Sequence, residues 1–273
     1  RHTELFCQVR ELSLSISCPE VARMILTRVE PVRYEGRMEA EVDEEDYTPE
    51  EVVVYSQLRL IRRHLLAILQ DRSVPLETRF GHLLTMVGVY QDDVDELLME
   101  ERPLDALPME EICQVAGGEL DTSKGMMETL LGVTEGWEYT EPELSEWFVQ
   151  TGEILASMSE QAFGNQRKAF YQALADAEIA REVVFEQLMV YFLFAYFCGS
   201  VYDEYYYGQA QLAVAACYHV ELLLFAKYQK QEALSMEDVI RYTYIYAREL
   251  EHSTPNILAT EQYMEEHPML KQG

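Results

Sequence analysis

The chain has 273 residues, which is long enough for one large domain or two smaller ones. Its 49 acidic and 21 basic residues give a net charge of -28, which argues strongly against nucleic acid, whose phosphates demand a basic surface. This acidity suits a basic partner or simply a soluble acidic protein. The five cysteines form no CxxC pair and residues 1–20 carry no signal peptide, so we expect a reducing, cytoplasmic compartment.

Residues 1–47 are predicted to form an N-terminal segment with one short helix. Apolar residues alternate with serines over residues 10–17, which is the period of a short strand, and residues 32–42 are a second candidate strand or hairpin. Ser17 is the predicted N-cap of the helix that follows the first of these strands. Most residues of the stretch 39–51 are acidic, which indicates a solvated loop or a disordered segment.

Residues 48–140 are predicted to form a helical hairpin followed by an irregular connection. Thr48 is a good N-cap, because a proline and two glutamates follow it in the first turn. The helix breaks at Pro75, and a second helix spans about 76–100. The first helix is expected to point three arginines at solvent: Arg59, Arg62 and Arg63. Glycines and prolines punctuate residues 101–140, where we place a soft domain boundary.

Residues 141–273 are predicted to form a C-terminal helical bundle. Its helices are expected near 141–163, 166–199, 205–230 and 236–251, with a short acidic helix before the tail. Ser235 caps the fourth of these helices, and Asp238 completes a weaker version of the capping box.

The bundle is organised around residues 183–201, in which Glu186 is the only charged side chain. A helix that is apolar all round must be buried in a protein core or in lipid. The uninterrupted apolar run from 188 to 198 is shorter than the roughly 20 residues that span a bilayer. We therefore predict a mainly α-helical, multi-helix bundle without a membrane span, with at most a small β element near the N-terminus.

The chain contains no GxGxxG, phosphate-binding loop, HExxH or nucleophile elbow. Glu186 is costly to bury as an ion, so we expect it to be neutral or bonded to a tyrosine or an arginine, and a structural role is favoured over a functional one. His219 lies in an apolar helix and is interpreted as a hydrogen-bonded core residue. The polar stretch 246–256 ends a helix, and its spacing favours C-terminal capping by His252 with an Asx-type turn at Asn256.

Three stretches resemble the flagellin lysine-N-methylase family. Residues 10–26, RELSLSISCPEVARMIL, are close to that family's REhSLSLSCPEAARLIL signature, in which h is an apolar residue. Residues 246–256 are similar to its YSREhEHSxxN motif. Residues 186–197 resemble its ENxLVYYFFRYF helix, with Gln187 in place of asparagine and Ala195 in place of arginine. The resemblance covers essentially the whole chain.

The resemblance implies a bacterial protein-lysine N-methyltransferase that transfers methyl groups from S-adenosylmethionine to flagellin. It also implies an iron–sulfur cluster held by cysteines upstream of this chain, and Arg1-His2 look like the end of that cysteine-bearing segment. The chain is therefore expected to lack the cluster, to bind no cofactor and to be inactive alone. Cys18 is the one cysteine that matches the motif, and it is either a cluster ligand or a buried thiol at a helix start.

Methyl transfer requires a neutral lysine amine, so a carboxylate, a phenol or an imidazole should take up its proton. The candidate catalytic residues are Glu186, Tyr191, Glu249 and His252. A cationic methylsulfonium cofactor would suit an acidic, aromatic-lined pocket. The alternative function is a non-catalytic acidic module that binds a basic or helical protein partner, and a third is a structural or dimerising domain. Binding of the cofactor and of flagellin separates these functions.

Overall fold

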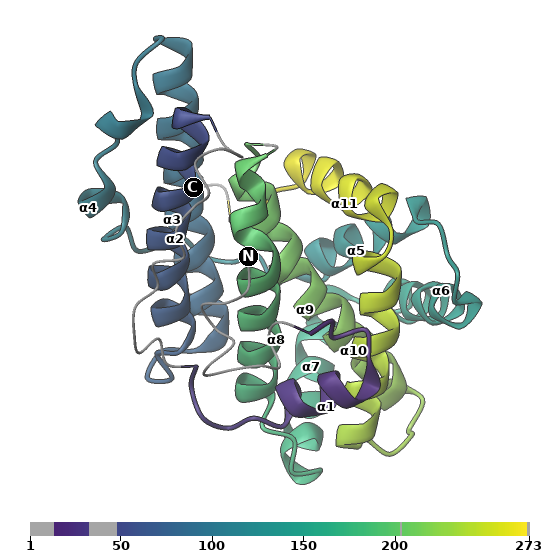
Figure 1. Ribbon diagram of the computed structural model, residues 1–273. Helices are drawn as coiled ribbons and strands as arrows, with labels where there is room; N and C mark the ends of the chain where they lie inside the picture. The colour runs from purple at the N-terminus through teal and green to yellow at the C-terminus, as the bar shows by residue number, and fades with distance from the viewer. Residues whose placement is uncertain (1–13, 33–47, 203, 272–273) are drawn as a thin grey trace.

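The computed structural model describes residues 14–32, 48–202 and 204–271 (Figure 1). In these residues it contains α-helices, short 3-10 turns and no β-strand, so the prediction of a mainly α fold is confirmed. The first half contains α1 (Pro19–Leu26), α2 (Pro49–Leu69), α3 (Leu76–Met99), η3 (Leu104–Ala106), α4 (Met109–Ile112), α5 (Lys124–Val133) and η4 (Thr134–Gly136). The second half contains α6 (Pro142–Ala156), α7 (Glu160–Asp176), α8 (Arg181–Tyr196), η5 (Phe197–Val201), α9 (Tyr206–Gln229), α10 (Met236–Glu251) and α11 (Thr254–Glu266).

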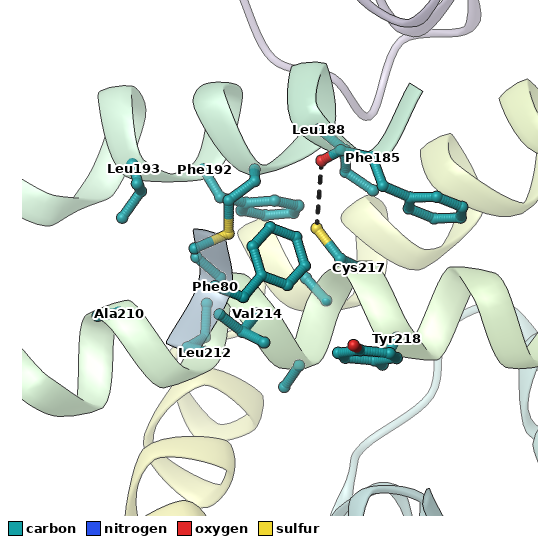
Figure 2. Close-up of a cluster of buried hydrophobic side chains, with 14 of the residues drawn as sticks. Phe80, Phe185, Leu188, Phe192, Leu193, Ala210, Leu212, Val214, Cys217 and Tyr218 are labelled. Carbon is teal, nitrogen blue, oxygen red and sulfur yellow. Dashed lines mark hydrogen bonds between the residues drawn. The ribbon is translucent and has the colours of Figure 1, made fainter. Parts of the chain in front are cut away.

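Helices α8 and α9 form the centre of the protein. Figure 1 shows α8 between the long α2–α3 pair and the α10–α11 pair, with α9 behind it. Both helices are apolar on every side, and their side chains point toward one another together with Phe80 of α3 (Figure 2). The Cys217 thiol on α9 donates to the Phe185 carbonyl oxygen on α8 over 3.7 Å. The prediction that the central helix is among the most buried is confirmed.

Two stretches, Arg181–Val201 and Tyr206–Gln229, are long and apolar enough to cross a membrane by length and composition alone. However, 78% and 94% of their apolar windows are buried inside the protein. Core helices pass the same test, and this degree of burial is typical of them.

Several predicted boundaries are wrong in the second half. The predicted helices 141–163 and 166–199 are in fact three helices, α6, α7 and α8. α7 ends because Glu178 adopts a left-handed backbone with φ of +59°, and the Ile179 N–H bonds back to the Leu174 carbonyl. Leu174 and Ile179 are both buried there, which completes a C-terminal capping motif in which glutamate takes the place usually held by glycine.

The first helix also begins differently from the prediction. Cys18 is the N-cap of α1, not Ser17, and residues 14–17 form a turn, not a strand. Residues 10–13 and 33–42, where the remaining predicted β structure falls, lie outside the described residues. The predicted N-cap at Thr48 and the predicted capping box at Ser235 are both present, and Thr48 forms a capping box as well.

Arg62 was expected to face solvent, but it is buried with 6% of its surface exposed. Its guanidinium lies 4.6 Å from the centroid of the Phe194 ring and donates to the Phe194 carbonyl oxygen over 3.3 Å. A cation at the carboxyl end of a helix is stabilised by the helix dipole, so burial of Arg62 against the last turn of α8 is favourable.

A close backbone contact joins α3 to the irregular connection that precedes α5. Gly117 and Gly118 have φ values of +121° and +73°, which L side chains rarely adopt. A Cβ atom on Gly81 would lie 2.6 Å from the Gly118 carbonyl oxygen. Glycine is therefore required at position 81 for α3 to approach this connection.

Candidate functional site

Three segments that are distant in sequence meet where α1 lies across α8 and α10 (Figure 1). The Tyr191 hydroxyl on α8 accepts a hydrogen bond from the Ile16 N–H over 3.1 Å and donates to Glu251 Oε1 over 2.5 Å. The Ser15 hydroxyl donates to Glu251 Oε2 over 2.5 Å. Each of the three stretches that carry the family resemblance therefore contributes to one polar cluster.

This cluster, here called the Tyr191–Glu251 cluster, consists of Ser15, Ser17, Tyr191, Glu251 and His252. The Ser17 hydroxyl links its two ends, because it lies 2.5 Å from Ser15 Oγ and 3.1 Å from His252 Nε2. Tyr191 is only 2% exposed, whereas Ser15 and His252 are exposed. The cluster thus runs from the protein core to the surface.

The electrostatics of the cluster keep the phenol of Tyr191 and that of the neighbouring Tyr196 protonated. Burial raises the pKa of Tyr191, and the neighbouring Glu251 carboxylate raises it further. The same two causes, in the same order, raise the pKa of Tyr196 one turn later on α8. Protonated phenols are hydrogen-bond donors, so they hold the Glu251 carboxylate in a fixed position, where it is available as a counter-ion or a proton acceptor.

A narrow cavity opens beside Glu251. Its walls are mainly apolar, and it is lined by Phe192, Tyr196, Gln209, Leu212, Leu250, Glu251 and Ile257. The cavity, here called the Glu251 cavity, has a volume of about 40 Å³. A single water needs about 10–15 Å³, so the cavity has room for about three water-sized groups, which is the end of a narrow unbranched chain. It is far smaller than the roughly 300–1,000 Å³ pockets that hold larger ligands.

Glu186, a predicted catalytic residue, lies elsewhere and is fully buried. Its carboxylate accepts hydrogen bonds from Arg72 Nε over 2.9 Å, from Arg72 Nη2 over 2.8 Å and from Arg79 Nη1 over 3.0 Å. This is the pairing with arginine that the sequence favoured. The carboxylate pairs with two guanidinium groups where α2, α3 and α8 meet, and Glu182 supplies a second negative charge to Arg79.

Glu249 also lies apart from the cluster. Its carboxylate accepts from the Thr140 N–H over 3.0 Å and from the Glu141 N–H over 2.5 Å, at the start of α6. Asn256 was expected to form an Asx-type turn, but it is fully buried and bridges other segments. Its side chain bonds both backbone groups of Glu138 and donates to the Glu249 carbonyl. Both residues therefore tie the 138–141 connection to the α10–α11 corner.

The two histidines occupy the positions that the sequence suggested for them. His252 is the C-cap residue of α10. His219 is fully buried, and its Nε2 donates to the Leu130 carbonyl over 2.8 Å, so its Nδ1 accepts from the Tyr246 hydroxyl over 3.1 Å. Burial lowers the pKa of His219 to about 4, which keeps the ring neutral.

Cys18 is exposed at the start of α1, so the interpretation as a buried thiol is wrong. Its thiol donates to Glu20 Oε2 over 3.0 Å, and this bond lowers the pKa of Glu20. Within the described part of the chain, no group of three or more cysteine, histidine or acidic residues is arranged to hold a metal ion.

Sequence reasoning selected Tyr191 and His252 but missed Glu251 and Ser15. Glu251 stands next to His252 in the third family-like stretch, and Ser15 lies within the first, so both were inside motifs already noted. The sequence does not show that Tyr191 and Glu251 are in contact, because they are 60 residues apart along the chain.

The family model of the FliB lysine N-methylase C-terminal domain matches residues 62–271. This range includes α8, α10 and the Glu251 cavity, while Ser15 and Ser17 precede it. No curated protein and no solved structure is significantly similar to the chain. Since the match covers well over half of the sequence, the chain belongs to the FliB lysine N-methylase family, of which it carries the C-terminal domain.

Proposed function

We propose that this domain receives the lysine side chain of flagellin for N-methylation, and that the lysine enters the Glu251 cavity. The single observation that carries the proposal is a carboxylate, held by a buried phenol, beside a narrow apolar cavity. A lysine side chain has a matching form, because it consists of a flexible aliphatic stem with a single ammonium charge at its end.

The cavity residues would act on the lysine in two ways. Phe192, Leu212 and Leu250 contact the methylene stem, and their apolar surroundings lower the pKa of an amine that is withdrawn from water. Glu251 binds the ammonium group and is the acceptor for the proton that the amine must lose before it can attack a methyl group. Tyr191 and Ser15 position the carboxylate through their hydrogen bonds.

The cofactors implied by the resemblance do not fit these residues. S-Adenosylmethionine, a nucleoside sulfonium that would supply the methyl group, is too large for a cavity of about 40 Å³. An iron–sulfur cluster needs several cysteine thiolates, and Cys18 is not part of any metal-binding group in the described residues. Both groups are therefore assigned to the cysteine-bearing segment that the family resemblance implies.

Methyl transfer in this proposal is a reaction of the bacterial cytoplasm, and it needs the lysine site and the methyl donor together. A reaction that needs two groups in line at near-contact distance is lost when one of them is absent. The described chain alone is therefore expected to bind flagellin without methylating it.

The test uses protein that includes the upstream cysteine-bearing segment, incubated with S-adenosylmethionine and flagellin, and measures the mass of the flagellin peptides. Glu251→Gln should lower the methylation rate by about 100-fold or more, as expected for loss of a general base. Glu265→Gln, at an exposed position on α11 outside the cavity, is the matched control and should keep the wild-type rate.

An unchanged rate in Glu251→Gln refutes the assignment of the lysine to this cavity. The alternative function, a non-catalytic acidic module for a basic partner, has the net charge of -28 in its favour. It predicts that flagellin binds but that Glu251→Gln and wild type methylate equally.

A further inference from the structure

A second and larger pocket lies between α5 and α6, away from the residues of the Glu251 cavity. Its volume of about 580 Å³ falls in the range of about 300–1,000 Å³ typical of ligand sites. Four residues on one face of α6 line it, at the i, i+3, i+4 and i+7 spacing of a helical stripe: Ser145, Phe148, Val149 and Gly152. α5 supplies the facing wall with Glu128, and Tyr139 lies in the connection between them.

The lining of this pocket combines negative charge with apolar and aromatic surface. Glu128 and Glu135 are its charged residues, and no lysine or arginine lines it. Glu128 pairs with Lys124 over 2.5 Å, while Glu135 is exposed and has no ion-pair partner in the described residues. Val149 is 60% exposed, so its apolar surface is available for contact.

The pocket is continuous with the segment that holds the candidate site. Tyr139 lines the pocket, and the next two residues, Thr140 and Glu141, donate their N–H groups to Glu249 on α10. Glu249 is two residues before Glu251. One rigid connection therefore joins the pocket to the end of α10 that carries the lysine-binding carboxylate.

We propose that the α5–α6 pocket is a docking site for a basic segment of the protein substrate, a part of flagellin other than the lysine that is methylated. A cationic side chain would lie between Glu128 and Glu135, near the faces of Tyr139 and Phe148, and apolar residues of the segment would cover Val149. Charge complementarity supports this occupant, because the chain carries a net charge of -28 and such a field steers basic partners. The inference rests on the proposed function for the identity of the substrate.

The structure offers a matched pair of variants. A Cβ atom on Gly152 meets nothing within 4 Å, so Gly152→Leu introduces a side chain into the pocket from an open Cβ position, and it replaces a helical glycine by a better helix former. Gly164→Leu is the control, because Gly164 on α7 also has open space around its Cβ position but lies outside the pocket. Glu135→Gln removes the exposed charge while keeping the shape of the side chain.

The experiment measures the dissociation constant of the full chain for immobilised flagellin. Two forms of flagellin are compared, the native protein and one whose lysines are acetylated. Gly152→Leu should weaken binding to native flagellin by about ten-fold or more, as loss of a central anchor does, and Gly164→Leu should bind as wild type. Glu135→Gln should weaken binding and reduce its salt dependence. Acetylated flagellin should bind wild type as weakly as native flagellin binds Gly152→Leu.

Three results would overturn the inference: wild-type affinity in Gly152→Leu, equal binding of native and acetylated flagellin, or no measurable binding of flagellin to wild type. A further experiment titrates the chain with S-adenosylmethionine. If the cofactor binds and Gly152→Leu abolishes that binding, the pocket holds the cofactor and the docking inference is overturned. A different result refutes the proposed function. Normal methylation in Glu251→Gln together with weak binding in Gly152→Leu refutes the Glu251 cavity and leaves the docking site in place.

Discussion

The buried imidazole of His219 makes the stability of this domain depend on pH in a predictable window. The ring is neutral in the native state, where both of its nitrogens are hydrogen-bonded and its pKa is lowered to about 4. In the unfolded chain, histidine has an ordinary pKa of about 6.5. Below about pH 6.5 the unfolded state therefore binds a proton that the native state does not, and the native state loses stability as the pH falls.

The size of this effect follows from the two pKa values. Each unit of pKa difference corresponds to about 1.4 kcal/mol. Protonation of this histidine in the unfolded state should therefore lower the free energy of unfolding by about 3 kcal/mol by pH 4. Between pH 7 and pH 5 the expected loss is about 2 kcal/mol, and above pH 7 the contribution is constant. A loss of this size is a large fraction of the total stability of a typical domain.

The assay is urea denaturation at pH 7 and pH 5, followed by tryptophan fluorescence, because Trp137 packs against His219 with the ring centroids 6.0 Å apart. His219→Gln keeps a hydrogen-bonding side chain but cannot titrate, so it should lose about 2 kcal/mol less than wild type between the two pH values. Phe148→Leu, which removes a ring 5.5 Å from His219, is a control that lowers stability but keeps the titrating group. An equal pH dependence in wild type and His219→Gln refutes the reasoning.

Three further predictions concern stability and are measured by the same denaturation assay at pH 7. Glu186→Gln should cost about 3 kcal/mol, because it removes the buried counter-ion of Arg79 and leaves that arginine only the half-exposed Glu182. Glu182→Gln, at the half-exposed carboxylate, should cost less than about 1 kcal/mol, and equal costs would contradict the buried-pair argument. Gly81→Ala should destabilise the protein by about 1–3 kcal/mol despite the better helix propensity of alanine, because its Cβ meets a backbone oxygen. Gly88→Ala is the control and should not destabilise the protein, because its Cβ makes ordinary contacts. Ser235→Ala should cost about 1 kcal/mol through loss of the cap on α10, and an unchanged denaturation midpoint would show that the cap contributes nothing.

The parts of the fold that were predicted correctly depend on signals between neighbouring residues. The N-caps of α2 and α10 are read from Thr48 and Ser235 and the three residues after each, and the burial of α8 from its uniform apolar composition. The end of α7 was missed because Glu178 carries no sequence signal for a left-handed backbone. Arg62 was misplaced because its partner, the Phe194 carbonyl, is 132 residues away.

The candidate site shows a similar division. The motifs point to this helix end, but Glu249, the residue predicted there, lies on a different face of α10 from Glu251. Residues two apart on a helix do not face the same way, and here Glu249 faces the start of α6 while Glu251 faces α8. Only the packing of α10 against two different neighbours decides which carboxylate meets Tyr191, and the spacing of the sequence carries no information on that packing.

The order in which a ribosome makes the chain has a consequence for the Tyr191–Glu251 cluster. The ribosome makes Ser15 before Tyr191, and Tyr191 before Glu251. A nascent chain that stops before residue 251 therefore leaves the Tyr191 hydroxyl without its carboxylate in an apolar environment, which is unfavourable. The entropic cost of closing a loop of 236 residues between Ser15 and Glu251 is only slightly larger than that of closing a shorter loop. The cluster therefore forms late, but the length of the loop does not prevent it from forming. A complete Tyr191–Glu251 cluster is thus a property of chains that have been translated past residue 251, and chains that terminate earlier lack it.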